Sequence, residues 1–218
     1  MERTIVSSRK ASLLSSHRVL RNTYCLLAMT LACSATTALL SASFRLPALS
    51  PWLFLVGAYG LMFLTHYTAN SAYGILAVFA LTSFIGYSLG PIVGSLLHSG
   101  ASDILITALG GTSLVFFGCS AYVLTTQKEL SFMGGLLTAG AIVLLISMIG
   151  NAFWQLPAFS LGISALFILV SSGTILLKTS EIIHGGETNY IRATVSLYVS
   201  LYNIFYSLLH LLSARRSD

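Results

Sequence analysis

Long apolar stretches with almost no charge dominate this chain, and its second half is the extreme case. Between Leu130 and Ala214 only four side chains are charged, and all four lie from Lys178 to Arg192. The whole chain is 56% hydrophobic and 8% charged, whereas a soluble domain carries about 25% charged residues. So few charged side chains do not suffice to hydrate the surface of a soluble protein. The sequence therefore predicts an all-α protein that lies in a lipid bilayer.

Seven apolar runs approach the roughly 20 residues that a helix needs to cross a bilayer. The second run is the shortest, and the connections between runs are too short to hold a soluble domain. We therefore expect one compact seven-transmembrane-helix bundle over residues 22–212, after a basic cytoplasmic tail (1–21) and before a short C-terminal tail (213–218). The expected spans are Asn22–Phe44, Pro51–His66, Tyr73–Leu97, Asp103–Thr126, Phe132–Trp154, Ala158–Ile183 and Tyr190–Leu212.

The N-terminal tail is polar, basic and rich in serine, so we expect it to stay flexible in the cytoplasm. Lys and Arg concentrate on the cytoplasmic side of membrane proteins. A cytoplasmic N-terminus places eight of the 11 Lys and Arg residues inside and three outside. Seven spans then put the C-terminus in the periplasm. The tail either serves as a partner-binding handle or only sets topology and contacts anionic lipid; its candidate binding residues are Arg3, Arg9, Lys10 and Arg18.

Three glycines recur at four-residue spacing in the third run, at Gly86, Gly90 and Gly94. This spacing puts all three on one helix face and lets a neighbouring helix approach closely. Pro91 lies within the same run and favours a kink. We interpret the face as a helix-packing surface; a gating hinge is the alternative.

Sequence signatures of enzymes are missing, because the chain has no HExxH, GxSxG or phosphate-binding loop. We therefore expect neither catalysis nor a cofactor or metal. The segment His184-Gly185-Gly186-Glu187 is similar to a ligand loop, but helix-end chemistry accounts for it. The two glycines end a helix, and His184 lies in that helix's last turn. Glu187 precedes the positive end of the next helix.

A resemblance to a known family covers nearly the whole chain. The last block, HGGETNYIRATVSLYVSLYNIF from His184 to Phe205, resembles the end of the Bax inhibitor-1 (transmembrane Bax inhibitor motif) family. It is most similar to a bacterial inner-membrane branch whose members modulate the FtsH protease. The family fold implied is a seven-helix membrane bundle. Other segments that fit the branch are SSHRVLRNTY (15–24), GLMFLTHYTAN (60–70), LGPIVGS (89–95) and GGTSLVFFGCSAYVLTT (110–126).

One activity implied by the resemblance is a pH-gated calcium leak, in which carboxylates on the last two helices share a proton. This chain departs from that pattern, because Lys178 and Ser200 stand where the two acids belong. Glu181 supplies a carboxylate, but at this spacing we expect it to pair with Lys178. Proton-linked regulation through Glu181, His184 and Glu187 remains an alternative. The polar candidates on the last two helices are Lys178, Glu181, His184, Glu187, Arg192, Ser200 and Asn203.

The other activity implied is binding to FtsH, an ATP-driven protease anchored in the inner membrane. Members of the bacterial branch resemble slowly degraded substrates that occupy the protease and restrain its action on other proteins. The resemblance thus implies the FtsH complex as the partner, gripped through the flexible tail. The alternative function is a pH-sensitive calcium or proton leak through the bundle.

Overall fold

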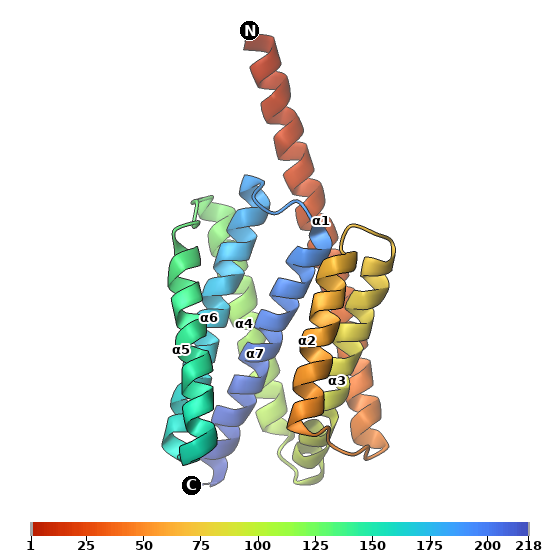
Figure 1. Ribbon diagram of the computed structural model, residues 1–218, viewed down its shortest axis with the longest axis vertical. Coiled ribbons are helices and arrows are strands. Elements are labelled where there is room, and N and C mark those ends of the chain that lie inside the picture. The colour runs from red at the N-terminus through yellow and green to blue at the C-terminus, as the bar shows by residue number, and fades with distance from the viewer. Residues whose placement is uncertain (1, 218) are drawn as a thin grey trace. The chain divides into compact units, whose positions relative to one another are not determined.

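Every secondary-structure element is a helix in the computed structural model, which describes the backbone of residues 2–217 and the side chains of residues 16–216 (Figure 1). The helices follow one another with short connections. In chain order they are α1 (Glu2–Ser43), α2 (Pro51–Thr68), α3 (Tyr73–His98), α4 (Ser102–Thr126), α5 (Met133–Trp154), α6 (Pro157–His184) and α7 (Tyr190–Ser217).

The bounds of α2 to α6 agree with the sequence-based spans to within two residues, because local signals mark them. The Ser50 hydroxyl accepts a hydrogen bond from the Leu53 amide at 3.3 Å and caps the start of α2, whose first residue is proline. Proline also opens α6. Gln155 ends α5 in a left-handed conformation with φ of 49°. Proline at a first helical position and a left-handed residue after a last turn are the usual boundary features.

The outer ends of α1 and α7 differ from expectation. The structure extends α1 back to Glu2, where the sequence predicted an irregular tail, and extends α7 to Ser217 through the expected C-terminal tail. No glycine or proline interrupts residues 2–43, so a helix begun in the membrane propagates outward one residue at a time. Among the candidate tail residues, Arg18 lies exposed on α1. Arg3, Arg9 and Lys10 fall outside the described side chains.

The helices group into two compact units. One unit comprises the residues up to Ser102 together with Glu187–Tyr198; the other comprises Asp103–Gly186 and the residues from Val199 onward. Helix α7 contributes its first part to one unit and the remainder to the other.

In the first unit, α3 packs against α1 through the predicted glycine face. A methyl group on Gly86 would come within 2.9 Å of Ser34 Cα and still closer to the Ser34 carbonyl oxygen. A methyl group on Gly90 would meet the Ser41 side chain and lie 3.1 Å from the Ala42 amide. The small residues therefore allow backbone-to-backbone contact, and the packing interpretation is confirmed.

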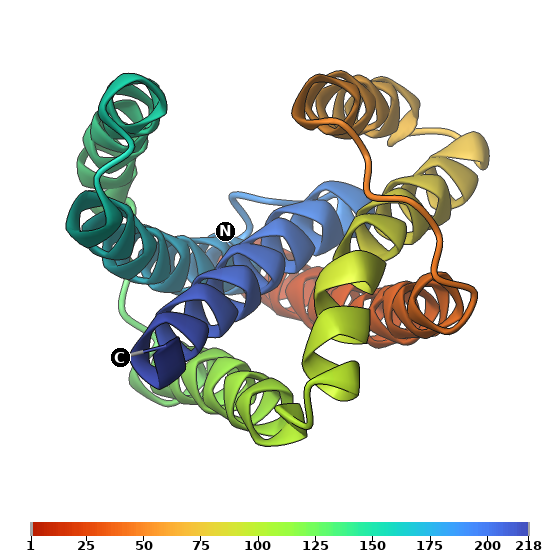
Figure 2. The same cartoon turned by 90° about the horizontal axis from the view of Figure 1, so that it is seen from below.

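Figure 2 shows the ribbon of α7 passing beside those of α1 and α3. A buried tyrosine fastens the first part of α7 to this pair of helices. Tyr198 is 2% exposed. Its hydroxyl donates to Ser34 Oγ at 2.7 Å and lies 3.3 Å from the Thr82 carbonyl oxygen. Burying a hydroxyl without a partner is unfavourable, so these contacts fix the position of α7 on α1 and α3.

Helix α2 is the shortest helix and carries the chain from the end of α1 back to the start of α3. Within the described residues, six helices are long and apolar enough to cross a membrane by length and composition, and α2 is not among them. However, Arg45 after α1 and His98 at the end of α3 lie 3.1 Å apart between Nη2 and Nε2. Because α1 and α3 end together, α2 carries the chain back across the same thickness. Its 18 residues span about 27 Å.

In the second unit, α5 packs on α6 and otherwise exposes a large apolar surface. A methyl group on Gly173 would lie 2.6 Å from Leu137 Cδ2, and one on Gly140 would lie 3.0 Å from Val170 Cγ2. Only Leu144 of α5 is buried. An apolar helix exposed in this way suits contact with lipid tails.

The glycine face yields a prediction about stability. We expect Gly86→Ala to lower the free energy of unfolding in detergent by about 1–3 kcal/mol, because the added methyl group meets the α1 backbone. Gly118 on α4 has open space around its Cα, so Gly118→Ala is the matched control. It should leave stability unchanged or raise it by about 0.5–1 kcal/mol. Denaturant titration measures both, and equal stability of the two variants would refute the close packing.

Candidate functional site

The polar segment between α6 and α7 begins where two glycines end α6. Gly185 takes a left-handed conformation with φ of 79°. The Gly186 amide donates to the Glu181 carbonyl oxygen at 2.8 Å, which satisfies a carbonyl at the end of the helix. Glycine adopts this conformation without steric penalty. The predicted helix end is therefore confirmed.

Lys178 and Glu181 form an ion pair one turn apart on α6, as the spacing predicted. The distance from Lys178 Nζ to Glu181 Oε2 is 2.6 Å, and the two side chains are 26% and 30% exposed. Partly exposed pairs of this kind contribute at most about 1 kcal/mol to stability. The ion pair bears on function, because Lys178 engages the Glu181 carboxylate that a proton-sharing pair would need.

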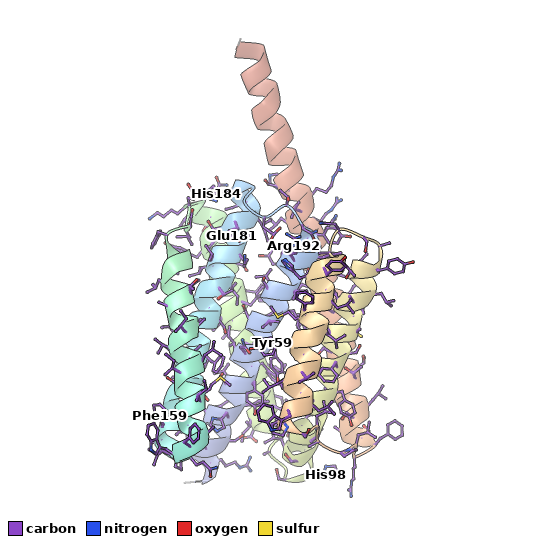
Figure 3. The ribbon with its side chains drawn as sticks, viewed as in Figure 1. Tyr59, His98, Phe159, Glu181, His184 and Arg192 are labelled. Carbon is purple, nitrogen blue, oxygen red and sulfur yellow. The ribbon has the colours of Figure 1, made fainter. Side chains whose placement is uncertain are left out.

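His184 lies in the last turn of α6, close to Glu181 (Figure 3). Its Nδ1 lies 2.9 Å from the Ser180 carbonyl oxygen, and its Nε2 lies 3.1 Å from the Gln127 carbonyl oxygen. Ser180 adds two bonds to the α4–α5 connection, since its hydroxyl donates to the Lys128 carbonyl and accepts from the Leu130 amide, both at 3.1 Å. The end of α6 is thus fastened to residues 127–130.

The two contacts of the His184 ring bear on proton-linked regulation. A neutral imidazole has one N–H, whereas the protonated ring has two. Both carbonyl oxygens are acceptors, so only the protonated ring donates to both. Glu181 is already engaged by Lys178, and Glu187 belongs to the other compact unit. The regulatory role of Glu181, His184 and Glu187 stays a prediction.

Asn189 organises the start of α7, and the sequence analysis missed it. Its Oδ1 accepts from the amides of Ile191 at 2.9 Å and Arg192 at 3.3 Å, which caps the helix. Its Nδ2 donates to the Ala69 carbonyl oxygen at 2.9 Å and to Asn70 Oδ1 at 2.8 Å. The side chain therefore joins α7 to the α2–α3 connection. Asparagine directly before an apolar helical run was the signal for this role.

Glu187 and Arg192 flank this cap. Glu187 Oε1 accepts the Asn189 amide at 2.9 Å, so its carboxylate stabilises the turn before α7, in agreement with the helix-end interpretation. Arg192 is half-buried on the first turns of α7 (Figure 3), and its Nε is buried with no hydrogen-bond partner among the described residues. A buried donor of this kind lowers stability unless a partner is supplied.

Ser200 and Asn203 lie one helical turn apart on α7 and carry no charge. Ser200 is 4% exposed, and Asn203 is half-buried. Lys178 and Ser200 are the residues predicted, from the resemblance, to stand where the two acids of a proton-sharing pair belong. A lysine and a serine do not share a proton as two carboxylates do.

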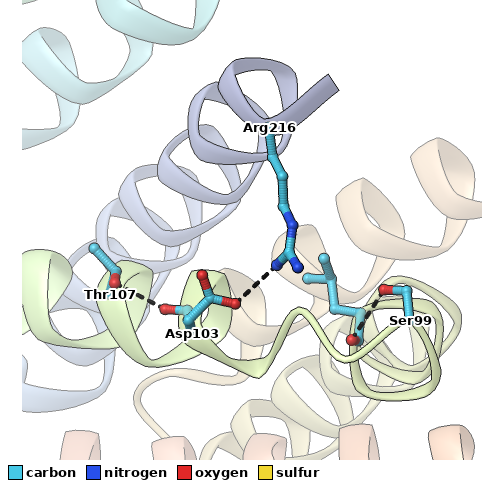
Figure 4. A network of polar contacts seen from close by, with 5 residues as sticks. Ser99, Asp103, Thr107 and Arg216 are labelled. Carbon is cyan, nitrogen blue, oxygen red and sulfur yellow. Dashed lines mark hydrogen bonds and ion pairs between the residues drawn. The ribbon is translucent and has the colours of Figure 1, made fainter. Parts of the chain in front are cut away.

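All four carboxylates whose side chains are described lie at helix ends or in a connection, and each has a partner. Asp103 at the start of α4 pairs with Arg216 at the end of α7, with 2.9 Å between Oδ1 and Nη1 (Figure 4). Glu129 accepts from the Ser131 hydroxyl at 2.8 Å, and Glu181 and Glu187 are engaged as above. Across residues 16–216, no three His, Cys, Asp or Glu side chains gather as a metal site requires.

Comparisons with known proteins agree along the length of the chain. The family model for the inhibitor of apoptosis-promoting Bax1 matches residues 16–217. The modulator of FtsH protease YccA from Escherichia coli K12 is 61% identical and covers 100% of both chains. A second Escherichia coli strain has an inner membrane protein YccA with the same identity and coverage. An uncharacterised Pasteurella multocida protein is 54% identical over 92% of this chain and 91% of its own.

The match spans the six long apolar helices, the short α2 and the polar segment between α6 and α7. The fold, an all-α membrane protein with seven helices, agrees with the expectation from sequence. The family expectation is confirmed: this chain belongs to the Bax inhibitor-1 family of multi-pass membrane proteins.

Proposed function

We propose that this chain binds the FtsH protease and restrains it, acting as a slowly degraded competing substrate and not as an enzyme. One observation carries the proposal: the 61% identity to the Escherichia coli modulator of FtsH protease extends over 100% of both chains. The match includes the N-terminal segment of that relative. The proposed location is the inner membrane, with the N-terminus in the cytoplasm and the C-terminus in the periplasm.

The N-terminal part of α1 suits the role of a handle. In Figure 1 the first turns of α1 extend past α2 and α3 of the same unit. Residues 2–15 form one unbroken helix. An isolated helix of this length is marginal in water. A pulling protease therefore unwinds it at little free-energy cost, so the helical conformation is compatible with the handle.

The part of α1 within the membrane resists the same pull. Its contact with α3 is made at backbone distance across Gly86 and Gly90. Tyr198 joins α7 to Ser34 on α1. Extracting α1 thus separates three helices at once. An easily gripped end followed by a tightly packed body is the combination that makes a substrate slow.

The handle predicts an effect of deletion on lifetime. We expect removal of residues 7–14 to lengthen the half-life of the protein in cells that contain FtsH, because the protease loses its grip. Pulse-chase labelling measures the half-life, and cells lacking the protease are the reference. A variant in which a Gly/Ser stretch of equal length replaces residues 7–14 separates the effect of the length of the N-terminal segment from the effect of its sequence. An unchanged half-life in the deletion variant would count heavily against the handle.

The packed body predicts the opposite change. Gly86→Ala should be degraded faster by FtsH than the unaltered chain and should protect a second membrane substrate less, because α1 leaves α3 more readily. Gly118→Ala is the matched control and should behave as the unaltered chain does. The assay follows both proteins in membranes containing the protease. Equal degradation of the two glycine variants would show that extraction is not limited by the α1–α3 contact.

The alternative function, a calcium leak, receives little support from the placement of the acids. The described carboxylates lie outside the middle of the spans and are all engaged. We therefore expect purified protein in liposomes to give little calcium flux above empty liposomes, measured with an entrapped indicator. Robust flux that Glu181→Gln abolishes would reverse the ranking of the two functions.

A further inference from the structure

A groove of about 410 Å³ opens where α1 and α3 end together, at the end of α1 farthest from the N-terminus. It lies wholly within the first compact unit. Small residues of both helices line the groove together with larger polar and apolar side chains. The lining includes Ser41, Arg45, Leu46, Pro91, Ser95 and His98.

The Arg45 side chain is held in place without being neutralised. Its Nη2 donates to His98 Nε2 at 3.1 Å, and His98 Nδ1 donates to the Gly94 carbonyl oxygen at 2.7 Å. With Nδ1 directed at a carbonyl oxygen, the His98 ring accepts from the guanidinium through Nε2. A guanidinium has five N–H donors, and His98 takes one of them. Among the described side chains, both ion pairs lie elsewhere, so no carboxylate faces Arg45.

The charge of Arg45 is not needed to cap the two helices either. Carbonyl oxygens at helix ends form a partial negative pole that attracts cations. Here backbone amides satisfy them. The amides of Arg45 and Leu46 donate to Ala42 and Ser41 at 3.2 and 3.0 Å, and that of Ser99 donates to Ser95 at 3.0 Å. The guanidinium remains available to a ligand.

The position of the groove indicates which class of ligand lies close to it. Both α1 and α3 qualify by length and composition to cross the membrane, so their common end lies at the level of the lipid head groups. The Ser41 and Ser95 hydroxyls already donate to the carbonyl oxygens of Tyr87 and Ile92, so Arg45 supplies the donors for a polar group. Pro91 and the exposed Leu46 offer an apolar edge. Arginine binds phosphate oxygens in a bidentate manner that lysine does not reproduce.

We propose that this groove is a binding site for the phosphate group of an anionic glycerophospholipid. The outward N–H groups of Arg45 bind the phosphate oxygens, and the glycerol and first acyl carbons lie along Pro91 and Leu46. His98 is a positioning residue that orients the guanidinium. This site is independent of the proposed action on FtsH.

The test is lipid binding by the full-length chain, purified in detergent and titrated with phosphatidylglycerol, with bound lipids counted by native mass spectrometry. We expect Arg45→Gln to weaken the tightest binding step by about tenfold, equivalent to about 1.4 kcal/mol. Arg45→Lys should weaken binding less than Arg45→Gln does, because lysine keeps the positive charge but lacks the bidentate N–H geometry of the guanidinium. Arg216→Gln is the matched control: Arg216 also lies at a helix end but is paired with Asp103, so binding should stay unchanged.

Two further arms identify the source of the phosphate. Phosphatidylcholine should bind more weakly, because its choline cation offsets the phosphate charge; equal binding would contradict the preference for anionic lipid. Inorganic phosphate should not displace phosphatidylglycerol at equal concentration; displacement would assign the site to free phosphate. Melting temperatures establish that each variant is folded, and if Arg45→Gln does not fold, Arg45→Lys decides. Unchanged binding by the folded Arg45 variant, or an equal loss in Arg216→Gln, would overturn the proposal.

Discussion

The close approach of α1 and α3 is the contact on which the first unit depends. It exists because Gly86 and Gly90 leave no side chain between the two backbones. Helices in a membrane gain little from the hydrophobic effect when they associate, since lipid tails are as apolar as their side chains. Tight van der Waals contact and a few buried hydrogen bonds therefore hold them together. The Tyr198 hydroxyl on Ser34 is such a bond, and it brings α7 to the same pair of helices.

The distribution of charge follows from the same membrane setting. A charge in the middle of a span is expensive, and the described carboxylates all lie at helix ends or in a connection. There they serve structure: Glu187 supports the turn before α7 and Asp103 pairs with Arg216. Lys178 pairs with Glu181. Each described carboxylate thus makes a structural contact, and the proposed function depends on contact with another protein.

The sequence predicted the fold well because the strongest signals in it are local. Apolar runs, Pro51, and the Gly185-Gly186 pair determine where helices lie and end, and the glycine spacing identified the packing face of α3. The predicted start of α1 was wrong. The polar composition of residues 2–21 suggested disorder, but no residue in this segment stops the helix from extending outward from the membrane. Asn189 and the contacts of the His184 ring were missed. Their partners, Asn70 and Gln127, are 119 and 57 residues away in the chain, and a single sequence does not reveal such pairs.

The central claim is that this chain engages FtsH through its N-terminal segment. The most direct measurement is affinity capture of the tagged full-length chain from native membranes, followed by quantification of the protease, beside a chain that lacks residues 7–14. Our account predicts that the protease is recovered with the full chain and falls to background with the shortened one. Recovery of no protease with the full chain, or of equal amounts with both, would contradict it.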